Sequence, residues 1–129
     1  MENSKRGNTG AGWHEFPYGK RYYFRSKWEL KYAIYLDFLK KQGKIKDWTY
    51  EEDEFWFEKI KRGVRSYKPD FKIYNMDGTF EYVEVKGFWD SKSLTKIKRM
   101  RIYHPHVKIT AVDPEFFKRM NKIFKGFIW

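Results

Sequence analysis

The sequence has no cysteine, only four prolines in 129 residues, and fewer acidic than basic side chains. Without cysteine the chain can form neither disulfides nor thiolate zinc sites, and thiol catalysis is excluded. No stretch approaches the roughly 20 uncharged apolar residues that a membrane-spanning helix requires. Residues 1–12 contain no apolar segment of the kind found in secretory signals, so we expect a cytoplasmic protein that does not act in a membrane.

Positive charge and aromatic rings are what the chain has in excess. Lys and Arg number 28 against 17 Asp and Glu, which gives a net charge of +11, and aromatic residues make up 22%. A disordered acidic protein is excluded, since such chains are poor in aromatic residues. The charge predicts a polyanionic partner, with DNA foremost and solubility alone as the alternative. A membrane surface is less favoured, because it calls for one basic amphipathic helix and the basic residues here are spread along the chain.

The length suits one domain, which we place at residues 13–129. Residues 1–12 are polar and rich in glycine, and we expect them to form a flexible N-terminal arm. Hydrophobic spacing and turn signals predict a short strand or hairpin edge at 16–24, one or two strands at 45–58 with a turn near 51–54, and strands at 67–74, 79–86 and 107–112. They predict helices at 26–41, 91–103 and from 114 onward. This order of elements indicates a mixed α/β fold with helices packed on a central sheet.

Residues expected to cap the helices are visible in the sequence. Ser26 and Asp113 are the predicted N-caps of the first and last helices, and Ser91 or Ser93 that of the middle one. Glu29 stands three residues after Ser26, the spacing of a capping box. The last strand, at 107–112, is expected to be buried.

The segments 67–74 and 79–86 are predicted to form a hairpin, because an Asn-Met-Asp-Gly turn joins them. Alternate side chains of a strand share a face, so Glu84 and Lys86 should lie side by side. Pairing across the turn brings Asp70 level with residue 84. Two carboxylates and an ammonium group are therefore expected within a few ångströms of one another, although an ordinary ion pair on an exposed sheet is the alternative.

Such a set is suited to divalent-metal chemistry on phosphate. Carboxylate oxygens are ligands that Mg²⁺ and Mn²⁺ prefer. The metal can activate a bound water and neutralise the charge that develops on a phosphate. A neighbouring lysine can orient or deprotonate the attacking water, or stabilise the pentavalent phosphorane.

Pro69-Asp70 followed by Glu84-Val85-Lys86 resembles the P-D…(D/E)-x-K signature of the restriction-endonuclease-like nuclease superfamily. Over roughly residues 24–112, the succession of Tyr-Lys-Pro-Asp-Phe, a hairpin, Glu-Val-Lys-Gly-Phe-Trp-Asp-Ser, a basic helix and an Ile-Thr-Ala-Val strand is similar to the phage endonuclease I-type Holliday junction resolvases. The resemblance implies a restriction-endonuclease-like core, in which a mixed central β-sheet is flanked by helices. The single nuclease domain would span residues 13–129.

The resemblance also implies a magnesium-dependent DNA endonuclease that leaves 5′-phosphate and 3′-hydroxyl ends. Asp70 and Glu84 would bind Mg²⁺ or Mn²⁺, Glu29 would complete the metal site, and Lys86 would position the nucleophile. Branched DNA is the substrate ranked first, and a four-way junction requires two symmetric cuts, which implies a homodimer. The alternatives are a nicking, flap or duplex endonuclease of a phage or mobile element, and a non-catalytic DNA-binding module.

Basic residues around this set are expected to hold the DNA backbone. Half of them lie on the predicted basic helix that follows the catalytic strand, for which a solvated face is the alternative. The predicted contacts are Arg21, Arg25, Arg65, Lys68, Lys96, Lys98, Arg99 and Arg101. For Tyr67 and Trp89 core packing is preferred over a role at the site. The acidic run at 51–54 is expected to be a solvated loop, with a second metal site as the alternative.

Overall fold

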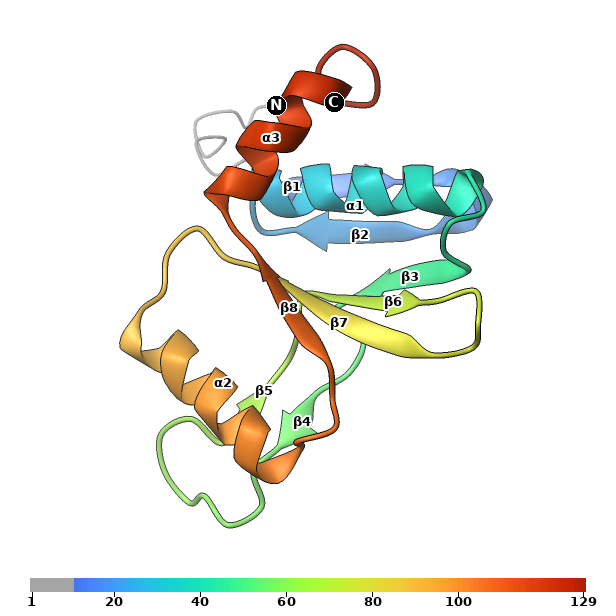
Figure 1. The fold of residues 1–129 in the computed structure, drawn as a ribbon. Helices are drawn as coiled ribbons and strands as arrows, with labels where there is room; N and C mark the ends of the chain where they lie inside the picture. Colours follow the sequence, from blue (N-terminus) through green and yellow to red (C-terminus); the bar gives the residue numbers. More distant parts are fainter. Residues whose placement is uncertain (1–10) are drawn as a thin grey trace.

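The computed structural model describes residues 11–129 (Figure 1). The predicted flexible arm lies outside the described residues except at its end, where Gly12 begins a strand and pairs with Phe24. The first strand thus begins at Gly12, one residue before the predicted start of the domain. Within residues 11–129, none of the helices is long and apolar enough to cross a membrane.

An antiparallel hairpin leads into the first helix. Strands β1 (Gly12–Glu15) and β2 (Arg21–Phe24) are joined by a short 3₁₀ turn at Pro17–Gly19, where proline and glycine predicted one. Helix α1 (Lys27–Lys41) begins at the predicted N-cap, since the Ser26 hydroxyl accepts a hydrogen bond from the Glu29 N–H at 3.1 Å.

The central sheet has four strands in the order β3-β6-β7-β8. β3 pairs antiparallel with β6 and β6 antiparallel with β7, whereas β8 runs parallel to β7. Because a parallel pair needs a long crossover connection, α2 (Ser91–Tyr103) lies between β7 and β8 in the chain, and α3 (Pro114–Phe124) follows β8. The strands are β3 (Asp47–Tyr50), β6 (Phe71–Tyr74), β7 (Phe80–Val85) and β8 (Ile109–Val112). The predicted mixed α/β architecture is confirmed.

The strand predicted at 67–74 is two strands rather than one. Strand β5 (Ser66–Tyr67) pairs with β4 (Phe55–Trp56) in a small separate hairpin, and β6 starts only at Phe71. Pro69 lies between them, and proline has no N–H to donate to a ladder. The chain therefore passes from one sheet to the other at Asp70.

Two further predictions need correction. The middle helix is capped by Asp90, not by Ser91 or Ser93: the Asp90 carboxylate accepts a hydrogen bond from the Ser93 N–H at 2.8 Å. A carboxylate at the N-cap also complements the positive end of the helix dipole. Strand β8 is an edge strand with Thr110 and Ala111 exposed, because the sheet ends there.

Aromatic side chains fill the core between the sheet, the N-terminal hairpin and α1. Phe24, Trp48 and Phe71 are fully buried. The ring centroid of Phe71 lies 5.2 Å from those of Tyr32 on α1 and Tyr50 on β3. Rings in tilted and edge-to-face contact fill space well and bury large apolar areas, which accounts for much of the chain's aromatic content.

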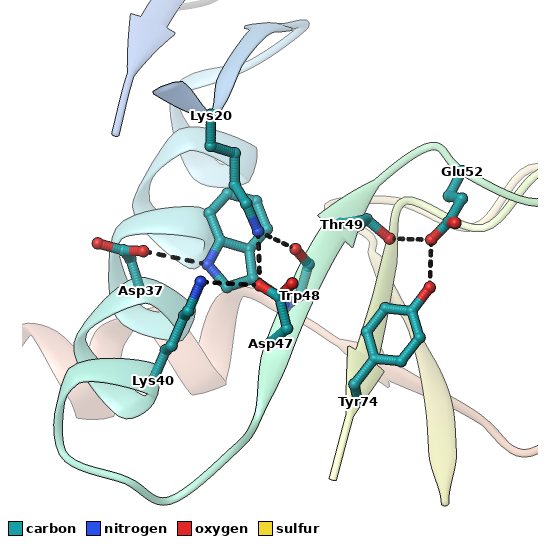
Figure 2. A network of polar contacts seen from close by, with 8 residues as sticks. All are labelled: Lys20, Asp37, Lys40, Asp47, Trp48, Thr49, Glu52 and Tyr74. Carbon is teal, nitrogen blue, oxygen red and sulfur yellow. Dashed lines mark hydrogen bonds and ion pairs between the residues drawn. The ribbon is translucent and has the colours of Figure 1, made fainter. Parts of the chain in front are cut away.

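A network of polar contacts connects the start of β3 to the N-terminal hairpin and to α1 (Figure 2). Asp47 accepts hydrogen bonds from Lys20, at 2.7 Å, and from Lys40 of α1, at 3.1 Å. The indole N–H of Trp48 donates to Asp37 of α1 at 3.3 Å. The hairpin, α1 and β3 are thus joined by charge as well as by packing, which keeps the beginning of α1 close to the end of β3.

Candidate active site

The predicted carboxylate and lysine set forms where β6 begins and β7 ends. The register of the two strands places Asp70 opposite Glu84. The Val85 N–H donates to Asp70 Oδ2 at 2.8 Å, and Lys86 Nζ lies 3.3 Å from Glu84 Oε2. Asp70 and Glu84 are only 9% and 8% exposed, so this is no ion pair on an open sheet face.

Glu29 joins this set from the first turn of α1. Only half of the predicted capping box is present, because the Glu29 carboxylate accepts a hydrogen bond from the Arg25 N–H, at 3.0 Å, rather than from the N-cap amide. The same oxygen, Oε1, accepts from the Tyr50 hydroxyl at 2.8 Å. These bonds hold Glu29 on the side of the helix that faces the end of β3.

Two buried tyrosines orient the glutamates. The Tyr67 hydroxyl donates to Glu84 Oε1 at 2.7 Å, so Tyr67 is both a core residue and a site residue. The Tyr50 hydroxyl orients Glu29 in the same way. Tyr50 was not identified as a site residue from the sequence. Its role depends on the pairing of β3 with β6, which no turn signal in the sequence indicates. For Tyr67, its position two residues before Pro69-Asp70 is a signal that could have been used.

The three carboxylates, Lys86 and Tyr67 line one cavity of about 280 Å³. Glu51 belongs to it but was assigned to a solvated loop. Its N–H donates to the Asp70 carbonyl at 2.8 Å, and its carboxylate lies 3.1 Å from the Arg25 guanidinium. The lining residues are Arg25, Glu29, Glu51, Tyr67, Lys68, Asp70, Glu84, Val85, Lys86 and Lys96.

Four carboxyl groups crowd together in this cavity. Burial, followed by the neighbouring Glu84 and Glu29 carboxylates, raises the pKa of Asp70 to about 8. Burial also raises the pKa of Glu29, although the hydrogen bond from Tyr50 opposes it. Burial and the Glu84 charge raise the pKa of Tyr67 far above its usual value, which keeps its hydroxyl protonated as a donor. The cavity is therefore a place where an added cation is stabilised.

Asp70, Glu84 and Glu29 are the residues that could hold such a cation. Within residues 11–129, no three carboxylate or histidine side chains are arranged so that they could hold a metal ion without some adjustment. Yet the donor set fits a hard divalent ion, because the neutral N–H and O–H donors engage only one oxygen of each carboxylate. The second oxygen of each, including the one that Lys86 pairs with on Glu84, can turn toward a cation.

Substituting Asp70→Asn should stabilise the protein at alkaline pH. The folded state keeps the Asp70 proton up to a pH of about 8, whereas an unfolded Asp loses it near 3.9. Stability from this group is therefore complete below about pH 4 and is lost as the pH rises toward 8. The advantage of the variant over the wild type should grow by about 1 to 3 kcal/mol between pH 5 and pH 8.

Urea denaturation in EDTA at the two pH values measures this difference. Glu58→Gln, in an exposed loop, is the control and should show no pH-dependent gain. A stability gap between Asp70→Asn and the wild type that stays the same at both pH values would contradict the charge crowding described above.

The predicted basic contacts divide into two groups. Arg25, Lys68 and Lys96 line the cavity with the carboxylates. The structure does not bring the others to it: the Arg99 guanidinium donates to the Val64 carbonyl, and Arg101 lines a separate cavity beside α2. The residues outside the carboxylate cavity are Arg21, Arg65, Lys98, Arg99 and Arg101.

The acidic run at 51–54 is neither a free loop nor, within residues 11–129, a second metal cluster. Each side chain has its own partner. Glu52 accepts from the hydroxyls of Thr49 and Tyr74 at 2.5 and 2.6 Å (Figure 2), and Asp53 lies 2.8 Å from Lys72 Nζ. These contacts fix the segment after β3 and so hold Glu51 at the cavity.

Comparison with known proteins places the chain in a family without assigning it an activity. Curated proteins gave no match. The sequence model of a family described as "Protein of unknown function (DUF1064)" matches residues 19–118, a range that includes all four residues of the carboxylate and lysine set. Because this match covers most of the 129 residues, the chain belongs to the DUF1064 family.

Proposed function

We propose that this protein is a metal-dependent DNA endonuclease with a restriction-endonuclease-like core. Asp70, Glu84 and Glu29 would hold Mg²⁺ or Mn²⁺, with Lys86 beside them. The observation that carries the proposal is the convergence of buried Asp70 and Glu84 with Lys86 in one open cavity. A purely structural ion pair does not need a third carboxylate, or two tyrosines that aim carboxylates at the same space.

The chemistry assigned to each side chain follows from its contacts. A bound divalent ion would lower the pKa of a water and neutralise charge on the phosphate. Lys86 carries its ammonium group at the cavity, where it can orient the attacking water or neutralise the charged transition state. Tyr67 and Tyr50 would keep Glu84 and Glu29 in place as the charges around them change. Attack on phosphorus would break its bond to the 3′ oxygen, leaving 5′-phosphate and 3′-hydroxyl ends.

The surroundings of the cavity favour a nucleic-acid substrate. Arg25, Lys68 and Lys96 stand around the carboxylates, and the net charge of +11 attracts a polyanion from a distance. With a cation in place, the acidic cavity becomes compatible with a phosphate. Branched DNA remains the substrate ranked first, ahead of nicked, flapped or plain duplex DNA. A homodimer of the protein would make the two symmetric cuts that a four-way junction requires.

A cleavage assay on a panel of DNA structures tests the proposal. Four-way junction, flap, nicked and linear duplex DNA are incubated with the wild type in Mg²⁺, in Mn²⁺ and in EDTA. We expect cleavage only with a divalent metal, and none by Asp70→Ala, with the junction cut fastest. Salt-sensitive binding without cleavage of any substrate would instead identify a DNA-binding module. Equal cleavage by the wild type and Asp70→Ala would reject the site.

A further inference from the structure

The outer face of the N-terminal hairpin carries exposed aromatic rings that the core does not use. Side chains alternate along β2, so Tyr22 and Phe24 face the core while Arg21 and Tyr23 face outward. Trp13 pairs with Tyr23 across the hairpin, and their ring centroids lie 5.5 Å apart. Trp13 is 60% exposed and Tyr23 is 49% exposed.

Positive charge accompanies these rings. The Arg21 guanidinium lies 4.2 Å from the centroid of the Trp13 ring, a cation–π contact. Within residues 11–24, Glu15 is the only acidic residue. Because the two rings touch each other and the arginine lies over one of them, the three side chains form one contiguous surface rather than scattered exposed residues.

The row of outward residues leads to the carboxylate cavity. Arg25 directly follows the last residue of β2, two residues beyond Tyr23 in the chain, and its side chain is exposed. Its guanidinium pairs with Glu51 and lines the cavity that holds Asp70 and Glu84. In Figure 1 the hairpin lies alongside α1, the helix that carries Glu29. Arg25 thus connects the end of the hairpin to the cavity, and a strand that lies on the hairpin face could extend past Arg25 toward the carboxylates.

We propose that Trp13, Tyr23 and Arg21 form a stacking platform for the bases of a single-stranded DNA segment next to the phosphate in the cavity. The position of that phosphate rests on the proposed function, whereas binding to the platform can be measured without it. Aromatic faces accept any base, and arginine supplies both stacking and charge. The substrate class that follows is DNA with unpaired nucleotides flanking the cut.

Charge favours DNA over a second copy of the chain as the occupant. If two copies met through the hairpin face, Arg21 and Arg25 of one copy would lie near those of the other, and this repulsion disfavours self-association through this face. A nucleic-acid strand gains from the same residues. Self-association through this face remains an outcome that the experiment below can detect.

Binding of a single-stranded oligonucleotide in EDTA, followed by fluorescence anisotropy, tests the platform. Trp13→Ala and Tyr23→Ala should each weaken binding by at least about fivefold, and Trp13→Phe should keep most of it. Trp56→Ala is the matched control, because Trp56 is 54% exposed on β4, at the other end of the molecule (Figure 1). Circular dichroism of each variant verifies that it is folded.

Three results would overturn the platform. The first is wild-type affinity in both alanine variants, and the second is an equal loss in Trp56→Ala. The third is a change from dimer to monomer on Trp13→Ala, measured by sedimentation, with unchanged DNA affinity per protomer. If the wild type cleaves DNA but the alanine variants bind normally, the stacking platform is rejected and the proposed nuclease activity is kept. If the variants lose binding but the wild type cleaves no DNA, the stacking platform is kept and the proposed nuclease activity is rejected.

Discussion

Lys86→Met is expected to slow DNA cleavage by about 10³-fold while tightening the binding of a divalent metal. The variant removes the ammonium group from the cavity and keeps an unbranched stem of similar length. Lys86 Nζ lies 3.3 Å from Glu84 Oε2 and 5.9 Å from the centroid of the Trp89 ring. A methionine can keep the contact with Trp89, so the fold should be preserved.

The two effects have opposite signs because Lys86 has two roles. As the neighbour of Glu84 it competes with a metal for that carboxylate, and its removal leaves the cavity more negative. In the proposed reaction it would act as a donor at the phosphate, where it would orient the water or neutralise the transition state. A residue that only stabilised the fold would change neither metal affinity nor cleavage in this manner.

Titration calorimetry with Mn²⁺ and single-turnover cleavage measure the two effects. Lys96→Met is the matched control, because Lys96 lines the same cavity from α2. It should lose less than about tenfold in rate, as expected for a phosphate contact. Lys86 would have no special role if Lys86→Met kept a tenth of the wild-type rate, or if both variants lost the same activity.

Phe71→Ala should cost about 3 to 5 kcal/mol of the free energy of unfolding. Phe71 is 0% exposed and its ring contacts Phe24, Tyr32 and Tyr50. Removing it would leave a cavity at the centre of the aromatic core, directly after Asp70 in the chain. We therefore expect the substitution to disturb the position of Asp70 as well as to lower the free energy of unfolding.

Chemical denaturation at neutral pH measures the cost, and Phe80→Ala is the control. Phe80 belongs to the neighbouring strand β7 but is 53% exposed, so its removal should cost less than about 1 kcal/mol. Phe71→Leu should lie between the two. Equal losses for Phe71→Ala and Phe80→Ala would mean that the aromatic cluster is not the main source of stability.

The contacts that were predictable are the local ones. Asp70, Glu84 and Lys86 come together because a short turn joins β6 to β7, and a tight turn determines which residues lie opposite each other. The N-caps Ser26 and Asp113 follow from side chains that bond amides three residues onward. In these cases the partners are close in sequence, or one turn fixes their register, so the pattern of residues is sufficient.

The position of Glu29 at the carboxylate cavity was expected from a resemblance and not from spacing. Tyr50, which holds it, and Glu51, which closes the cavity beside Arg25, were not expected. Their places depend on the pairing of β3 with β6 and on how α1 packs against β3. β3 and β6 are far apart in the chain, and the short turn at 42–46 that joins α1 to β3 does not fix how the two pack, so the side chains that fill the space between these elements determine the register.

By itself, the sequence determined the α/β class, the basic character and the pairing of two carboxylates with a lysine. Only the tertiary structure decided which arginines reach the cavity, which tyrosines orient its carboxylates and that aromatic rings remain exposed on the hairpin. The physical reason is how far apart the contacting residues lie in the sequence. Hydrogen bonds within a turn or helix end are encoded by neighbouring residues, whereas contacts between α1, β3 and the hairpin form only when the aromatic core closes around Trp48 and Phe71.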